Sequence, residues 1–314
     1  MADLILHHYA GSLFSEKIRL LFGYLGLPWK SVEIASIMPR PELMPLTGGY
    51  RRTPVMQEGA DIYCDTRVIA ERLAEIAGHS AICRGFAQNR IAEWADSQLF
   101  RIVVAVTFQP RALTTMMSRL SDTEISAFQK DRAELVKGAP PITTFSASAA
   151  EGHLRTYLDE LDEWISHPFL FGNAPCIADF SIYHCLWLVQ NNPAVAPLLD
   201  GRIKVTDWRR RMAAFGHGRF QAMSRADALA VGRAATPRPP AADASGLPPG
   251  LKLGDSVAVT PTDYGLVPVE GKLVSCSTRE VAIERTDPDA GTVVVHFPRI
   301  GFVVDKADSV ALSR

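Results

Sequence analysis

The chain has 314 residues, enough for about two domains that each bury a core. Its 33 basic and 34 acidic residues nearly cancel, which argues against a nucleic acid or an anionic membrane recognised through bulk charge. Five scattered cysteines without a Cys-x-x-Cys pair argue against a disulfide framework or a zinc site. With neither a signal-peptide core nor a run of about 20 apolar residues, we expect a soluble, cytoplasmic protein.

The first eighty residues alternate between strand and helix patterns. We expect strands at residues 4–9, 29–34, 55–57 and 62–64. A helix follows the first strand, with apolar residues recurring up to Leu25 and a stop at Gly26-Leu27-Pro28. Asp65 and Thr66 cap a second helix that ends at Gly78. The predicted order is therefore β-α-β-loop-β-β-α.

Residues 86–230 contain helix patterns and no convincing strand. Long apolar periodicities cover residues 90–106, 154–165, 178–189 and 205–215. The segment 109–150 is too long for a simple turn, and Ser121-Asp-Thr-Glu124 in it is a capping box that opens an extra helix. We expect an all-helical domain here.

The sequence pattern changes twice in the last eighty residues, first to that of a linker and then to that of short strands. Residues 233–250 are rich in alanine and proline, which is typical of a semi-rigid linker. Five short strand patterns follow in residues 251–314, separated by turns such as Asp263-Tyr264-Gly265, and they suggest a small β-barrel. This tail has seven basic and nine acidic residues, unlike a nucleic-acid-binding barrel. We expect it to stabilise a dimer or to cover an active site.

Three short segments carry the strongest functional information. They are Tyr9-Ala-Gly-Ser-Leu-Phe-Ser-Glu-Lys-Ile-Arg19, Arg51-Arg-Thr-Pro-Val55 and Ile62-Tyr-Cys-Asp-Thr-Arg67, each beside the end of an expected strand. In order and spacing they resemble the Ser-x-Phe-Ser opening, the Val-Pro-like dipeptide and the Glu-Ser-like pair of the glutathione S-transferase family. The resemblance implies a thioredoxin-like domain at 1–80 and a helical transferase domain at 86–230. The tail is not part of the common family pattern and resembles an extension found in some bacterial members.

The resemblance implies that Ser12 stabilises the thiolate of glutathione. A free thiol has a pKa of about 8.5, and lowering it by one unit needs about 1.4 kcal/mol of thiolate stabilisation. A helix N-terminus with hydroxyl donors can supply a few kcal/mol. Ser12 stands between the first strand and the first helix, and Ser15 is the reserve donor, with Phe14 between them in the glutathione site. The alternative is that Ser12 only caps the helix.

The other two segments would hold the peptide. In the family the proline matching Pro54 is cis, and the residue matching Thr53 pairs with the glutathione backbone like an added strand. Arg52 matches a position near the glycyl carboxylate, although it could equally be an uninvolved surface residue. Asp65 and Thr66 would receive the γ-glutamyl end at a helix start, in addition to capping that helix.

The resulting prediction is a homodimeric glutathione transferase that acts in detoxification by adding the thiolate to a small apolar electrophile. Phe108 and Arg111 are the candidates for the electrophile pocket. Glutathione is the co-substrate, and no metal is expected because the histidines lack ligand spacing. Two alternatives remain open: a glutathione-dependent isomerase, and a non-catalytic protein that uses the fold for protein interaction. Cys176-Ile-Ala-Asp179 resembles a folding motif of the helical domain and is interpreted as structural.

Overall fold

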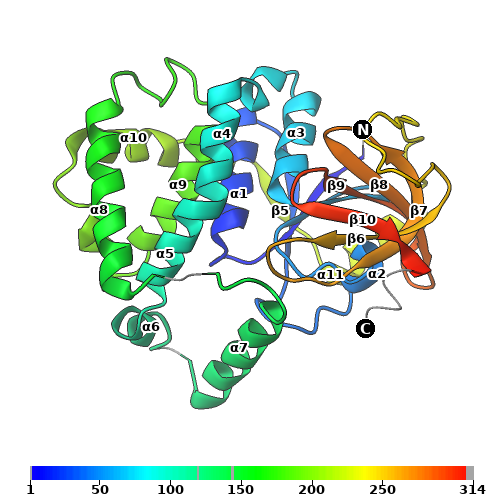
Figure 1. Cartoon of the computed structure of the whole chain (residues 1–314), viewed down its shortest axis with the longest axis horizontal. Helices are drawn as coiled ribbons and strands as arrows, with labels where there is room; N and C mark the ends of the chain where they lie inside the picture. Colours follow the sequence, from blue (N-terminus) through cyan, green and yellow to red (C-terminus); the bar gives the residue numbers. More distant parts are fainter. Residues whose placement is uncertain (1, 119, 143–144, 309–314) are drawn as a thin grey trace.

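The computed structural model describes residues 2–118, 120–142 and 145–308 (Figure 1). The strands are β1 (Leu4–His8), β2 (Trp29–Glu33), β3 (Val55–Glu58), β4 (Asp61–Cys64), β5 (Phe220–Ala222), β6 (Ser256–Pro261), β7 (Val269–Cys276), β8 (Glu280–Asp287), β9 (Gly291–Pro298) and β10 (Phe302–Lys306). The α-helices are α1 (Leu13–Leu25), α2 (Met44–Thr47), α3 (Thr66–Ile76), α4 (Phe86–Trp94), α5 (Phe100–Thr107), α6 (Pro110–Met116), α7 (Asp122–Leu135), α8 (Ala147–Trp164), α9 (Ile177–Gln190), α10 (Ile203–Ala213) and α11 (Arg225–Ala234). Shorter turns of helix are η1 (Ser80–Cys83), η2 (Ala95–Leu99) and η3 (Ala196–Leu199).

The N-terminal part has the predicted thioredoxin-like order. β1 lies between parallel β2 and antiparallel β3, and β3 pairs with antiparallel β4. Alternate residues of β1 face opposite ways, so Leu6 enters the core beneath α1 and α3, while Ile5 enters a second core on the other face. α1 ends at Gly26, whose φ of 66° is the left-handed conformation that closes a helix.

The helical part is confirmed, with one correction. α9 is buried along most of its length and packs against α1 and α4 (Figure 1). The segment 109–150 contains α6 and α7, and the capping box opens α7 as predicted. The expectation of no strand in residues 86–230 is wrong, because Phe220–Ala222 forms β5 and pairs with β2 in parallel. Three exposed residues are too few to give a strand pattern, and here the pairing partner determines the strand.

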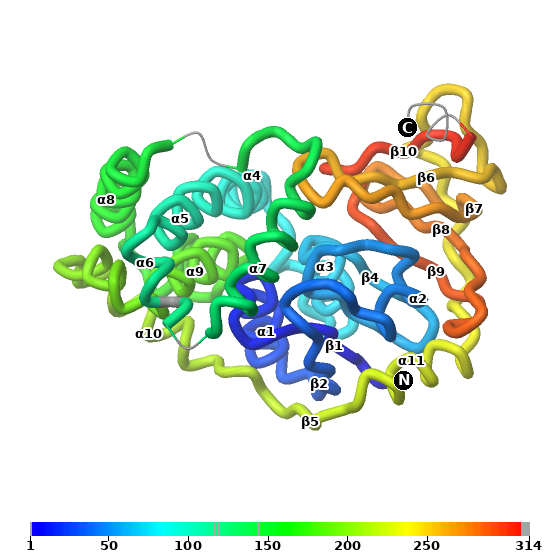
Figure 2. The backbone as a smooth tube through the Cα atoms, turned by 90° about the horizontal axis from the view of Figure 1, so that it is seen from below, coloured from blue at the N-terminus to red at the C-terminus, as the bar shows by residue number. Residues whose placement is uncertain are grey.

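Residues 251–314 contain five strands, as the sequence predicts. They are antiparallel neighbours in the order β10-β6-β7-β8-β9. Phe297 of β9 and Phe302 of β10 have ring centroids 5.3 Å apart, so the sheet curls around a shared core like a barrel. The barrel does not stand apart from the rest. The outer edge of β9 pairs in parallel with β4, and the two parts make one ten-stranded sheet (Figure 2).

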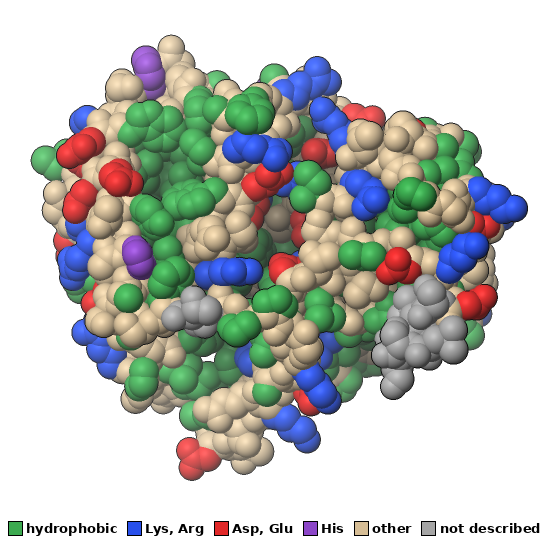
Figure 3. All heavy atoms as spheres, viewed as in Figure 1, with side chains coloured by type: hydrophobic (Ala, Val, Ile, Leu, Met, Phe, Trp, Pro, Cys, Tyr) green, Lys and Arg blue, Asp and Glu red, His purple; other side chains and the backbone are tan. Residues whose placement is uncertain are grey.

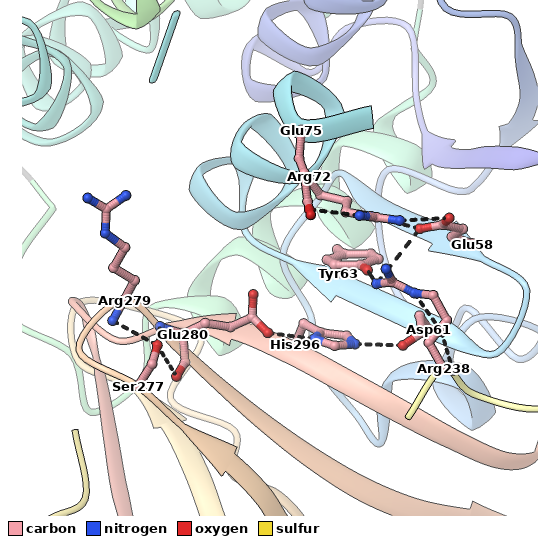
Figure 4. A network of polar contacts seen from close by, with 10 residues as sticks. All are labelled: Glu58, Asp61, Tyr63, Arg72, Glu75, Arg238, Ser277, Arg279, Glu280 and His296. Atoms are coloured by element: carbon pink, nitrogen blue, oxygen red, sulfur yellow. Dashed lines mark hydrogen bonds and ion pairs between the residues drawn. The ribbon is translucent and has the colours of Figure 1, made fainter. Parts of the chain in front are cut away.

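A polar cluster with a buried centre, His296 and Asp61, and an exposed rim, Arg238 and Glu280, lies beside the pairing of β9 with β4. His296 of β9 bonds to Asp61 of β4 at 2.9 Å and to Glu280 of β8 at 2.8 Å (Figure 4). Its ring stacks on Tyr63 with 4.5 Å between centroids. Arg238, from the segment that leads into the tail, donates its backbone N–H to Asp61 and a guanidinium N–H to the Tyr63 hydroxyl. We call these five residues the His296 cluster.

Candidate active site

A cavity of about 260 Å³ lies where the N-terminal part, the helices and the tail meet. In the space-filling view a recess between the helical half and the tail has acidic and basic side chains along its rim (Figure 3). All six residues that the resemblance assigns to glutathione binding line this cavity: Phe14, Arg52, Thr53, Pro54, Asp65 and Thr66. They come from the start of α1, the entry to β3 and the start of α3.

The Thr53–Pro54 segment is held in place by a buried arginine. The peptide bond between these two residues is cis. Arg40 donates to the Thr53 hydroxyl and to the Arg51 carbonyl, both at 2.9 Å. It also donates to the Ala35 carbonyl at 2.9 Å, so one guanidinium fixes the loop before β3 at several points. Sequence reasoning missed Arg40 because its role depends on contacts with other segments.

Asp65 and Thr66 form the start of α3. Asp65 has a φ of 94°, which is uncommon for a residue with a Cβ and costs on the order of 1–3 kcal/mol. Its carboxylate accepts the Arg67 backbone N–H at 2.9 Å, as a helix cap does. Burial raises the pKa of Asp65, although the Arg67 N–H and the charge of Arg52 oppose the rise. Asp65 therefore both caps α3 and lines the cavity.

The two serines do not line the cavity. Ser12 is the N-cap of α1, and its hydroxyl accepts the Ser15 backbone N–H at 3.2 Å. The Ser15 hydroxyl is buried and has no hydrogen-bond partner among the residues that the structure describes. Phe14, between them in sequence, reaches the cavity and packs against His184 with 4.8 Å between ring centroids. The capping role of Ser12 is thus visible in the geometry, and its role toward a thiol is not.

An ion pair between the buried Lys17 and the partly exposed Asp96 of the cavity wall has no counterpart among the sequence predictions. Asp96 lies in the π-helical turn η2, a type of irregularity that is common at functional sites. It accepts from Lys17 at 2.6 Å and bonds to His184 at 3.0 Å. Burial opposes ionisation of Asp96, but the charge of Lys17 and the hydrogen bond from His184 outweigh it and hold the pKa below its usual range. In sequence Asp96 is one polar residue in a long helix pattern, which gives no local sign of this role.

The tail supplies part of the cavity wall. Asp263 and Tyr264, in the connection between β6 and β7, line it together with Ile300, Gly301 and Phe302. Arg52 forms an ion pair with Asp263 and donates through Nε to the Tyr264 carbonyl at 3.1 Å. We call residues 262–266 the tail loop. The tail thus forms one wall of the cavity, and whether it covers an active site or stabilises a dimer stays a prediction. The sequence indicated Asp263-Tyr264-Gly265 only as a turn.

The two residues proposed for the electrophile pocket lie outside this cavity. Phe108, at the end of α5, stacks on Phe128 of α7 with 6.5 Å between ring centroids. Arg111 of α6 forms an ion pair with Glu151 of α8. Neither is among the cavity-lining residues. The structure brings the six binding residues together and leaves Phe108 and Arg111 apart from them.

The described part of the chain shows neither a metal-binding cluster nor a membrane-spanning helix. Within residues 2–118, 120–142 and 145–308, no group of three or more His, Cys, Asp or Glu side chains is arranged to hold a metal ion. In the same ranges no helix has both the length and the apolar character needed to cross a membrane.

Comparison with known proteins identifies the family. The sequence model described as "Glutathione S-transferase, N-terminal domain" matches residues 6–81. A GST-like protein from Pseudomonas syringae is 39% identical, with a TM-score of 0.80 and a match covering 98% of this chain and 100% of that chain. A glutathione S-transferase from Rhodospirillum rubrum is similar in fold, at 15% identity and a TM-score of 0.50 over 67% of this chain and 88% of that chain. A comparison with curated proteins gave no match. The 39% identity over nearly the whole length of both chains shows that this chain belongs to the family of GST-like proteins.

Proposed function

We propose that this protein binds glutathione in the 260 Å³ cavity and is a cytoplasmic, homodimeric glutathione transferase that detoxifies small apolar electrophiles. One observation carries the proposal: six residues assigned to glutathione from three separate segments line a single cavity. A chance resemblance in three short motifs would not require their side chains to converge. The Pseudomonas syringae relative, itself described only as GST-like, supports the family and leaves the reaction open.

The chain's own groups suit the three parts of the tripeptide. Thr53, beside its cis bond, would pair with the cysteinyl backbone as an added strand does. The start of α3 offers N–H groups and the Thr66 hydroxyl to the γ-glutamyl carboxylate, and Asp65 offers an acceptor to its ammonium group. The thiol would then lie toward the start of α1, where Ser12 or Ser15 would have to stabilise the thiolate.

A second candidate, a glutathione-binding protein without transferase activity, is favoured by the position of the serines. The Ser12 hydroxyl already accepts the Ser15 N–H, and neither serine lines the cavity. A thiolate needs a donor within about 3 Å to gain from it. A protein that binds glutathione and does not ionise it would serve as a sensor or an interaction scaffold.

Glutathione binding tests the proposal. We expect Thr66→Ala to lose about 1.5–3 kcal/mol of binding free energy, because it removes a hydrogen bond to a charged group at a helix start. Arg52→Ala should lose less, because that guanidinium is already engaged by the tail loop. Calorimetric titration of both variants measures the difference. A larger loss from Arg52→Ala would show that the ligand site has been misplaced.

Thiolate absorbance separates the two candidates. If Ser12 stabilises the thiolate, Ser12→Ala should raise the pKa of bound glutathione toward that of the free thiol and reduce turnover about 100-fold. If Ser12 is only a cap, the variant should lose about 1 kcal/mol of stability and leave the thiol titration unchanged. The measurement is the pH dependence of thiolate absorbance in wild type and variant, with a thermal melt of each. Superimposable titrations would favour the non-catalytic candidate.

A further inference from the structure

The guanidinium of Arg52 is enclosed by the tail. Its Nη2 donates to Asp263 and, at 2.6 Å, to the Tyr264 carbonyl, which also accepts from Nε at 3.1 Å. The Tyr264 ring covers one of its faces with 4.2 Å between Cζ and the ring centroid, and Phe302 lies at 5.7 Å. Only 10% of the Arg52 side chain is exposed. Among the described contacts, Nη1 has only the Asp65 carboxylate, at 3.9 Å.

Because of these contacts, the Arg52 guanidinium has no free edge with which to bind a ligand carboxylate. A carboxylate binds a guanidinium best through two parallel N–H bonds from one edge of its planar fork. Arginine has two such pairs of nitrogens, Nη1 with Nη2 and Nε with Nη2. Nη2 belongs to both, and it is already bonded to Asp263. The edge through Nε is closed as well, because Nε donates to Tyr264.

The charges around the cavity are also unfavourable to an anion at this end. Two carboxylates, Asp65 and Asp263, flank the single guanidinium of Arg52. Of the other two carboxylates in the lining, Asp96 is paired with Lys17 and Glu93 with Arg67. Neither leaves a positive charge free to offset the excess of one carboxylate around Arg52. A further negative charge near Arg52 would meet net repulsion, and a neutral or positive group would not.

The tail loop is anchored in a way that resists displacement by a ligand. Thr262 donates its backbone N–H to Gly301 at 3.0 Å, and Gly265 donates to the Leu135 carbonyl at the end of α7 at 2.7 Å. The Tyr264 ring lies 6.3 Å from that of Phe100 on α5. The loop backbone is therefore held on both sides of Asp263, and a ligand carboxylate could take its place at Arg52 only by rotating the Asp263 side chain away.

We propose that Asp263 is a specificity-determining residue and that the cavity takes glutathione-type peptides whose glycyl end carries no negative charge, an amide-linked amine being the most favoured group there. The inference rests on the proposed function, which places the glycyl end of the peptide beside Arg52. It assigns the tail a direct role in substrate choice: the tail supplies the carboxylate that a free glycyl end would otherwise contribute. An ester or amide avoids that competition, and an amine gains the attraction of Asp263 and Asp65.

The test compares three thiol peptides by calorimetry: glutathione, its glycyl monoethyl ester, and glutathione with ethylenediamine linked as an amide to the glycyl carboxyl. We expect the wild-type protein to bind the ester about three- to tenfold more tightly than glutathione, and the amine-bearing peptide more tightly still. Asp263→Asn should bind glutathione more tightly than wild type does and should lose the preference for the amine.

Asp289→Asn is the matched control, because Asp289 is an exposed acid of the tail in the turn between β8 and β9, outside the cavity lining. It removes the same charge and should keep the wild-type order of affinities. The wild-type order is decisive even if Asp263→Asn is poorly folded. Equal or tighter binding of free glutathione than of the ester would overturn the inference and leave the proposed function in place. Failure of all three peptides to bind would overturn the proposed function and this inference with it.

Discussion

The tail meets the N-terminal part of the molecule at two junctions of different physical character. At the first, β9 pairs with β4, apolar side chains from both parts fill one core, and the His296 cluster lies beside the strands with His296 and Asp61 buried (Figures 2 and 4). At the second, the tail loop meets Arg52 at the wall of an open cavity, and 43% of the Asp263 side chain is exposed. The apolar core of the first junction is buried, as is typical of a contact that stabilises the fold. The second junction is charged and partly exposed, as is typical of a contact that faces a ligand.

The largest effect should come from removing the tail. Ending the chain at Pro239 would uncover the apolar face that includes Ile5, Val55 and Ile62, and would leave β4 as an unpaired edge. We expect aggregation, or loss of cooperative unfolding, measured by size-exclusion chromatography and thermal melting. A soluble fragment with a sharp melting transition would show that the N-terminal and helical parts fold without the tail.

Substitutions of two valines compare the contribution of the shared core to stability with that of the tail surface, in the full-length chain. Val295 of β9 is completely buried opposite Ile62, whereas Val303 of β10 is 44% exposed. Val295→Ala should lower the free energy of unfolding by about 2–3 kcal/mol, because it removes buried methyl groups from the shared core. Val303→Ala should change it by about 0.5 kcal/mol or less. Equal losses in urea denaturation would mean that the shared core contributes little to holding the tail.

The difference between the two junctions also explains what the sequence could predict. Hydrophobic periodicity and turn residues predicted the thioredoxin-like order and the five tail strands, because these patterns are local. The pairing of β9 with β4, the strand β5, and the meeting of Asp263 with Arg52 join segments far apart in the chain. A local pattern does not predict which strand edge a segment will pair with, or which arginine it will contact.

The residues of the candidate site also fall into two groups, those that a local motif predicts and those that only contacts between distant segments identify. The motifs at Thr53-Pro54 and Asp65-Thr66 could be recognised because each is a short local structure, a loop before a strand and a helix start. Asp96 could not, because an acid within a helix pattern is usually a solvated surface residue, and only burial beside Lys17 distinguishes it. The roles of Phe108 and Arg111 remain predictions that the cavity does not support.

A pH titration of stability sharpens the comparison at the buried junction. Burial lowers the pKa of His296, but its hydrogen bonds to Asp61 and Glu280 outweigh burial and raise the pKa above 6.5. The stabilisation from protonated His296 is therefore complete below pH 6.5 and is lost as pH rises through the raised value. Asp61 acts in the opposite sense: its lowered pKa makes its contribution present above pH 3.8 and lost as pH falls.

The corresponding variant is His296→Gln. We expect it to lose about 1–2 kcal/mol at pH 6, where the wild-type His296 is protonated and bonded to both carboxylates. The loss should shrink as pH rises above 6.5, because the wild type then loses the same interaction. Urea denaturation of both proteins between pH 5 and pH 9 measures the difference. A loss that stays constant over this range would show that His296 contributes by packing on Tyr63 rather than by charge.

Of the polar contacts at the two junctions, the one between Asp263 and Arg52 should contribute least to stability, and Asp263→Asn tests it. Asp263 is partly exposed, so its pair with Arg52 is screened by solvent, and asparagine keeps an oxygen that can accept from the guanidinium. We expect the free energy of unfolding to fall by less than about 1 kcal/mol, below the loss from His296→Gln at the same pH. Both variants are compared in one series of urea denaturations at pH 6. A loss equal to that of His296→Gln would show that Asp263 also stabilises the attachment of the tail. A small loss, together with altered discrimination between glutathione and its glycyl ester, would show that this contact acts in ligand selection. A residue that only stabilises the attachment of the tail would not distinguish two peptides that differ in that one charge.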